Sequence, residues 1–180
     1  MVYILLADGF EEIEALCPLD LLRRAGVEAK TVSVTEKRVV TGSHGIPVTA
    51  DLTAENSLSD IEMLVLPGGM PGAVNLDKSQ FCDGLLRAAA KNGAYIAAIC
   101  AAPSVLASLG LLEGKNATAH AGFQDKLAGA HVLDAEVVVD GNITTSYGLG
   151  GAIPFALELV RQLAGQAEAD RIRNAIAYRH

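Results

Sequence analysis

The sequence has no tryptophan, few aromatic residues (4%) and few charged residues (19%). Its 14 basic side chains are outnumbered by 21 acidic ones, which gives a formal net charge of −7. A nucleic-acid surface needs a basic patch, so we expect no nucleic-acid partner. No apolar run approaches the roughly 18 residues that a membrane span requires, so we expect no membrane partner either.

Features of exported proteins and of metal sites are also missing. The apolar residues 2–7 form a short run without a basic flank, and acidic residues follow, unlike a signal peptide. Three widely spaced cysteines fit a reducing compartment better than a disulfide framework, so we expect a cytoplasmic location. There is no Cys-x-x-Cys or His-Glu-x-x-His pattern, no G-x-G-x-x-G or P-loop lysine, and the four histidines are scattered. We therefore predict no metal and no organic cofactor.

Hydrophobic residues, by contrast, make up 51% of the 180 residues, enough for one domain over 1–180 with a single core. Strand-like apolar segments alternate with segments of helical periodicity. The predicted strands cover residues 2–7, 28–34, 61–66, 94–99, 117–119, 136–139 and 143–146, with short β pieces in 38–51, and the predicted helices cover 10–25, 79–91, 102–109, 152–163 and 169–176. Residues 67–72 are rich in Gly and Pro, which predicts a loop. This alternation predicts an α/β fold, with a mostly parallel sheet covered by helices on both faces.

Cys100 is the first candidate functional residue, because it lies between a predicted buried strand and a predicted helix. A thiol on such a sharp turn lies at the positive end of the helix dipole, beside the unpaired N–H groups of Ala101 and Ala102. Serine hydrolases present their nucleophile on a similar turn. We therefore expect a lowered thiol pKa and a reactive thiolate. The alternative is that Cys100 is a small core residue, which is the role expected of Cys17 and Cys82.

Ligands of parallel α/β sheets bind beyond the carboxyl ends of the strands. Residues 8–14 and 68–72, Cys100 and His120 all follow predicted strands, so we expect them to converge. His120 could serve as an acid or base, although a lone histidine is often structural. A backbone N–H of the 68–69 glycine pair could face an anion.

Glu14 is the second candidate functional residue, because it sits among apolar helix positions near the expected site. A buried carboxyl group has a raised pKa and, as the neutral acid, could donate a hydrogen bond to a thiolate. Glu11 and Glu12 open the same helix, where its dipole favours carboxylates. We expect these two side chains to be solvated charges.

Four segments resemble those of the ThiJ/PfpI superfamily, namely residues 7–14 (ADGFEEIE), 66–69 (LPGG), 97–103 (AAICAAP) and the segment that contains His120. The resemblance covers nearly the whole chain. It is closest to the branch of the Parkinson-disease-associated protein, with its deglycase and glyoxalase III-like members. The resemblance implies a flavodoxin-like three-layer sandwich and a homodimer.

The same resemblance implies roles for individual residues. Cys100 corresponds to the reactive cysteine, Glu14 to a protonated glutamate beside it, His120 to a nearby histidine and Gly69 to a glycine whose N–H faces the thiol. It implies a cofactor-independent glyoxalase or deglycase that acts on small α-oxoaldehydes such as methylglyoxal, with the N–H groups of Gly69 and Ala101 stabilising an oxyanion. The alternative function is an oxidative-stress sensor or chaperone that works through sulfinate formation at Cys100.

The chain departs from the family pattern in ways that bear on these expectations. His44 stands where close relatives carry an arginine near the partner subunit's site, which weakens the case for anion binding across a dimer. Ala101 stands where the protease-like branch has a histidine, and the His-x-Glu pair of class I glutaminases is missing. The cysteine peptidase and amidase interpretations therefore rank below the glyoxalase one.

Overall fold

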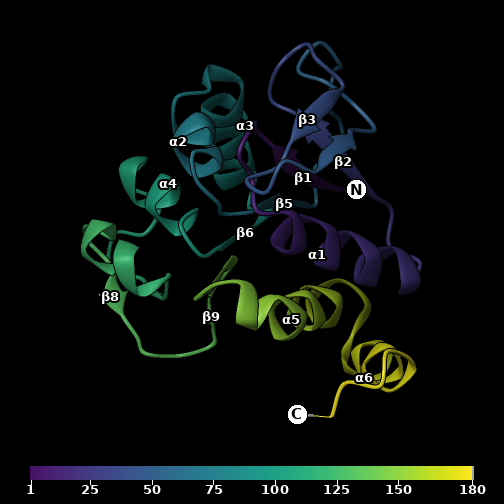
Figure 1. The fold of residues 1–180 in the computed structure, drawn as a ribbon. Coiled ribbons are helices and arrows are strands. Elements are labelled where there is room, and N and C mark those ends of the chain that lie inside the picture. The colour runs from purple at the N-terminus through teal and green to yellow at the C-terminus, as the bar shows by residue number, and fades with distance from the viewer. Residues whose placement is uncertain (180) are drawn as a thin grey trace.

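A computed structural model describes residues 1–179, with a six-stranded sheet at its centre (Figure 1). The sheet has the strand order β2-β1-β5-β6-β10-β9, in which only β9 runs antiparallel to its neighbour. Its strands are β1 (Val2–Leu6), β2 (Ala29–Ser33), β5 (Met63–Leu66), β6 (Tyr95–Ile99), β9 (Val137–Asp140) and β10 (Ile143–Ser146). This confirms the predicted mostly parallel sheet.

Helices cover both faces of the sheet. One face carries α2 (Gly72–Asp77), α3 (Gln80–Lys91) and α4 (Pro103–Ser108), and the other carries α1 (Glu12–Arg24), α5 (Ala152–Ala164) and α6 (Gln166–Ala175). In β1, Tyr3 and Leu5 belong to the first core, whereas Ile4 and Leu6 belong to the second. Because successive strand residues point to opposite faces, a strand buried on both sides is a continuous apolar run, which is why these strands could be predicted.

Smaller elements border this three-layer body. They are the hairpin of β3 (Val39–Thr41) and β4 (Pro47–Thr49), the pair β7 (Asn116–Ala117) and β8 (His131–Val132), and the short 3-10 helices η1 (Ala121–Lys126) and η2 (Leu149–Gly151). Helix α2 was not predicted. It follows the Pro- and Gly-rich loop, and its N-cap residue Pro71 makes no side-chain capping bond, so the usual start signal is missing.

The loops that follow β1, β5 and β6 meet at one edge of the sheet. The backbone N–H of Glu11 donates to the carbonyl of Gly68 at 2.9 Å, which ties the segment after β1 to the segment after β5. Gly68 also approaches the Cys100 side chain, and the His120 N–H donates to the Cys100 carbonyl at 3.0 Å. The expected convergence of residues 8–14, 68–72, Cys100 and His120 is thereby confirmed. Within residues 1–179, no helix is both long and apolar enough to cross a membrane.

Candidate active site

Cys100 occupies a strained turn between β6 and α4. Its φ angle is +65°, a conformation that residues other than glycine rarely adopt. The turn is held from two sides, since the Cys100 N–H donates to Ser146 at 2.9 Å and its carbonyl accepts the N–H of His120 at 3.0 Å. The side chain remains partly exposed, whereas that of Cys82 is fully buried. The core-residue interpretation therefore fits Cys82 and not Cys100.

Glu14 lies in the first turn of α1, and its residue is only 1% exposed. Its Oε2 accepts the backbone N–H of Gly68 at 2.9 Å, and its buried Oε1 has no hydrogen-bond partner among residues 1–179. The Cys100 side chain lies beside this carboxyl group, since both border the same side of Gly68. A Cβ atom on Gly68 would lie 2.8 Å from both the Cys100 Cβ and the Glu14 Oε2. Only glycine at position 68 therefore leaves room for this contact between acid and thiol.

The pKa values of the pair are both raised. Burial raises the pKa of Glu14 to about 7, against the opposing effect of the Cys100 side chain and of the hydrogen bond from Gly68. Burial also raises the pKa of the Cys100 thiol to about 12, and the charge of an ionised Glu14 adds to this effect. The expected lowering of the thiol pKa is therefore wrong, because burial of the sulfur is the largest effect and raises that pKa. The six-residue helix α4 is a weak dipole beside a buried carboxylate.

Two backbone N–H groups face the sulfur. Hydrogen bonds from Gly69 and Ala101 act to lower the Cys100 pKa, although burial outweighs them. Gly69 has a φ of +88°, and Ala101 is 1% exposed. The structure thus brings both predicted N–H donors to Cys100.

His120 lies beside the thiol but does not pair with it. A Cβ atom on Gly148 would lie 3.7 Å from the His120 ring and 3.8 Å from the Cys100 Sγ, so both border the same small space. The ring Nδ1 accepts the N–H of Gly122 at 3.2 Å and caps η1. Among residues 1–179, no hydrogen bond joins the His120 ring to the Cys100 side chain.

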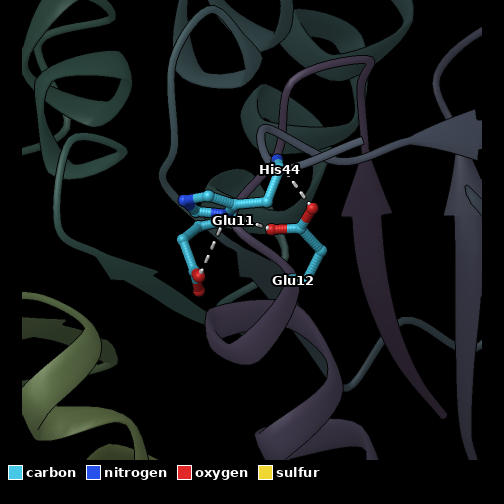
Figure 2. A group of neighbouring side chains, drawn as sticks. All are labelled: Glu11, Glu12 and His44. Carbon is cyan, nitrogen blue, oxygen red and sulfur yellow. Dashed lines mark hydrogen bonds and ion pairs between the residues drawn. The ribbon is translucent and has the colours of Figure 1, made fainter. Parts of the chain in front are cut away.

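The expectation that Glu11 and Glu12 are solvated is wrong. These residues are 8% and 3% exposed, and the imidazole of His44 lies against their carboxylates (Figure 2). Burial acts to raise the pKa of Glu12, but hydrogen bonds from His44 outweigh it and lower that pKa to about 2. His44 lies 32 positions after Glu12 in the chain, so the local sequence around Glu12 could not predict this interaction.

Cys17 also differs from its expected role. It was predicted to lie in the core, but it is partly exposed on α1. It borders an open groove between α1 and the segment after α6, where Ile13, a close neighbour of Glu14 in sequence, is 51% exposed. Burial raises the pKa of Cys17 to about 11, so nothing in its surroundings activates it.

The DJ-1/PfpI family profile matches residues 1–162 of the chain, so this protein belongs to that family of the ThiJ/PfpI superfamily. DJ-1 homolog A of Arabidopsis thaliana is 37% identical over 182 residues, which are 99% of this chain but 46% of the relative. The chain thus spans about half the length of that plant protein. A protein named as a deglycase in Thermococcus kodakarensis is 37% identical over 166 residues, which are 90% of this chain and 98% of the relative.

Solved structures are similar over almost the whole chain. The structure of a cysteine-to-alanine mutant of a DJ-1 superfamily protein from Salmonella typhimurium has a TM-score of 0.95 at 34% identity, and covers 99% of this chain and 98% of its own. Oxidized DJ-1 from Toxoplasma gondii has a TM-score of 0.93 at 35% identity with the same coverage. The expected flavodoxin-like α/β sandwich is therefore confirmed.

Proposed function

We propose that this protein is a cysteine-dependent, cofactor-independent enzyme of the glyoxalase or deglycase kind, acting on small α-oxoaldehydes such as methylglyoxal. The observation that carries the proposal is the buried Glu14 carboxyl group, with a pKa raised to about 7, beside the Cys100 side chain and with a buried Oε1 that has no hydrogen-bond partner among residues 1–179. An acid that titrates near neutral pH can both give and take a proton during turnover. The deglycase name of the Thermococcus relative supports the same class of reaction.

The pair can supply a thiolate without becoming doubly charged. When Glu14 holds the proton and Cys100 is ionised, the total charge equals that of the thiol beside a carboxylate. The acid then donates a hydrogen bond to the sulfur rather than repelling it, and the N–H groups of Gly69 and Ala101 point to the same atom. In this scheme the thiolate forms as the pair loses its first proton.

The chemical steps balance without an oxidant or a metal. The Cys100 sulfur attacks the aldehyde carbon of methylglyoxal, and Glu14 protonates the resulting oxyanion to give a hemithioacetal. Ionised Glu14, or His120, then removes the proton from that carbon and returns it to the neighbouring carbon through an enediol, which leaves a thioester. Water hydrolyses the thioester to lactate and regenerates the thiol. Gly69 and Ala101 stabilise the oxyanions by their N–H groups.

The test is lactate formation from methylglyoxal by purified protein without added cofactor, in the presence of a chelator. We expect Cys100→Ser and Glu14→Gln to lower kcat/KM at least 100-fold, and the control Cys82→Ala, whose side chain lies in the core away from the site, to keep the rate within about threefold. No lactate from the parent protein, or unchanged turnover in Cys100→Ser, would overturn the proposal.

A second candidate function is oxidation sensing through a sulfinate at Cys100. It is favoured by the partial exposure of Cys100, and by the similarity to a DJ-1 structure in the oxidized state. Two hydrogen peroxide molecules would each transfer one oxygen atom to the sulfur and leave as water. Intact-mass measurement after mild peroxide should show two added oxygens confined to Cys100. Oxidation spread evenly over all three cysteines would contradict this function.

We also propose that the protein forms a homodimer. The support is the open groove along α1 that Ile13 and Leu16 line together with residues after α6, since an exposed apolar face of this kind is typical of an interface. Sedimentation analysis should give twice the chain mass for the parent, and Ile13→Asp should shift it towards the monomer. A parent protein that sediments as a monomer at micromolar concentration would contradict this proposal.

A further inference from the structure

Two buried carboxylates and an imidazole form a cluster at the start of α1, outside the cysteine site. The carboxylate oxygens of Glu11 and Glu12 and the ring nitrogen of His44 each offer one ligand atom, and these atoms lie within 4.8 Å of one another. Figure 2 shows the imidazole facing both carboxylates. From the His44 Nδ1, the distance is 2.8 Å to the Glu12 Oε2 and 4.0 Å to the Glu11 Oε1.

From this geometry we propose that Glu11, Glu12 and His44 form a binding site for a divalent transition-metal ion such as Zn²⁺. Zinc bonds of about 2.0–2.2 Å to nitrogen and carboxylate oxygen place tetrahedral ligand atoms roughly 3.3–3.6 Å apart. The two distances from the Nδ1 atom bracket this range. The His44 side chain is 67% exposed, so a small movement of the ring can equalise them.

The Glu11 carboxylate gives independent support. Its side chain is only 10% exposed, and its Oε2 caps α1 by accepting the N–H of Glu14 at 2.7 Å. Its Oε1 accepts no hydrogen bond from any of residues 1–179, and His44 at 4.0 Å is too far to provide one. A charged oxygen on a side chain that is nine-tenths buried gains from a counter-charge, and a cation between Glu11 and Glu12 would supply one.

The backbone around the cluster is already fixed. The turn between β3 and β4 is hydrogen-bonded to the segment before α1, with Gly9 donating to Thr41 and Ser43 donating to Phe10, each at 2.7 Å. A Cβ atom on Gly42 would clash with the Glu12 side chain, so glycine lets the turn approach this closely. The ligands therefore need little reorganisation on binding, which favours affinity.

The donor set selects the class of metal. One imidazole nitrogen with two carboxylate oxygens suits zinc and neighbouring transition metals, whereas Ca²⁺ and Mg²⁺ prefer six or more oxygen ligands. A dication with two carboxylates and a neutral imidazole leaves no net charge in the cluster. An arginine at position 44 could not bind a metal, so the site depends on the histidine at this position.

The test is isothermal titration of the apo protein with ZnCl₂ in the parent, His44→Arg, Cys100→Ala and His131→Ala. We expect one Zn²⁺ per chain in the parent, and an affinity at least tenfold weaker in His44→Arg. His131→Ala, which removes an exposed histidine on β8, and Cys100→Ala should bind as the parent does. Equal affinity in His44→Arg, or lost binding in Cys100→Ala, would overturn the proposal.

X-ray absorption at the zinc edge gives a readout that does not depend on a variant folding. In the parent protein with one equivalent of Zn²⁺, we expect one imidazole and otherwise oxygen ligands. A sulfur ligand would place the metal at a cysteine and contradict the site. The lactate assay is run with a chelator, so its result does not depend on zinc binding. The metal site and the proposed enzyme activity can therefore fail independently of each other.

Discussion

At the scale of single residues, the site depends on where one proton lies. The raised pKa of Glu14 favours its neutral acid near pH 7 and the N–H groups of Gly69 and Ala101 favour a thiolate, whereas burial opposes it and raises the pKa of the Cys100 thiol to about 12. His120 contributes less, because its Nδ1 already accepts the N–H of Gly122 and its ring makes no hydrogen bond to the thiol. Glu14 is therefore the main proton carrier in our scheme.

We predict unequal effects for the two groups in lactate formation. His120→Ala should lower kcat/KM by less than tenfold, whereas Glu14→Gln should lower it at least 100-fold, the usual size of a general acid-base contribution. Steady-state kinetics of both variants at pH 7 measure the difference. A larger loss for His120→Ala than for Glu14→Gln would make His120 the principal acid-base group.

At the scale of elements, the site depends on close packing between the β5–α2 loop and the turn at Cys100 that follows β6. Gly68→Ala would place a methyl group 2.8 Å from the Cys100 Cβ and 2.9 Å from the Ala101 nitrogen. We expect a loss of about 1–3 kcal/mol in the free energy of unfolding, as for other overpacked sites, and at least a tenfold loss of kcat/KM. Urea unfolding and the lactate assay measure the two effects.

Gly84→Ala is the matched control. Gly84 lies within α3, and a Cβ atom there would meet nothing within 4 Å. Because alanine favours a helix over glycine, this variant should gain about 0.5–1 kcal/mol and keep its activity. If both alanine variants were equally stable and active, the close packing around Gly68 would not be needed.

The local sequence could predict some elements of the site but not others. The placement of Cys100 on a strand-to-helix turn and the burial of Glu14 were predictable, because such turns and apolar neighbours leave local signals. The burial of Glu11 and Glu12 was not, because their partner His44 comes from the turn between β3 and β4. The raised thiol pKa was also missed, since it depends on how deeply the sulfur is buried beside Glu14.

At the scale of the whole molecule, the alternation of apolar strands and amphipathic helices was enough to predict the sheet and its two helical layers. Strands of a parallel sheet are buried on both faces, so β1 and β5 are continuous apolar runs. Strand order and the pairing of β7 with β8 were not predictable, because they depend on contacts between distant segments. Helix α2 was not predicted, because no capping residue marks its start in the sequence.

Stability should also respond to pH through Glu14. Its pKa is raised from 4.5 to about 7, so its stabilising contribution is complete below pH 4.5 and is lost as pH rises through 7. Glu14→Gln cannot ionise, and we expect it to gain about 2–3 kcal/mol relative to the parent between pH 4.5 and 8. Urea unfolding across this range measures the difference, and a constant difference would show that Glu14 has an ordinary pKa in the folded protein.

The most direct test of the central claim is the pH dependence of Cys100 alkylation by iodoacetamide, followed by peptide mass in the parent and in Glu14→Gln. The amide is a weaker hydrogen-bond donor to a thiolate than the carboxylic acid. We therefore predict that the variant reacts more slowly at pH 7 and that its midpoint moves to higher pH. Faster alkylation in Glu14→Gln would contradict the account, because it would mean that Glu14 is ionised and opposes the thiolate.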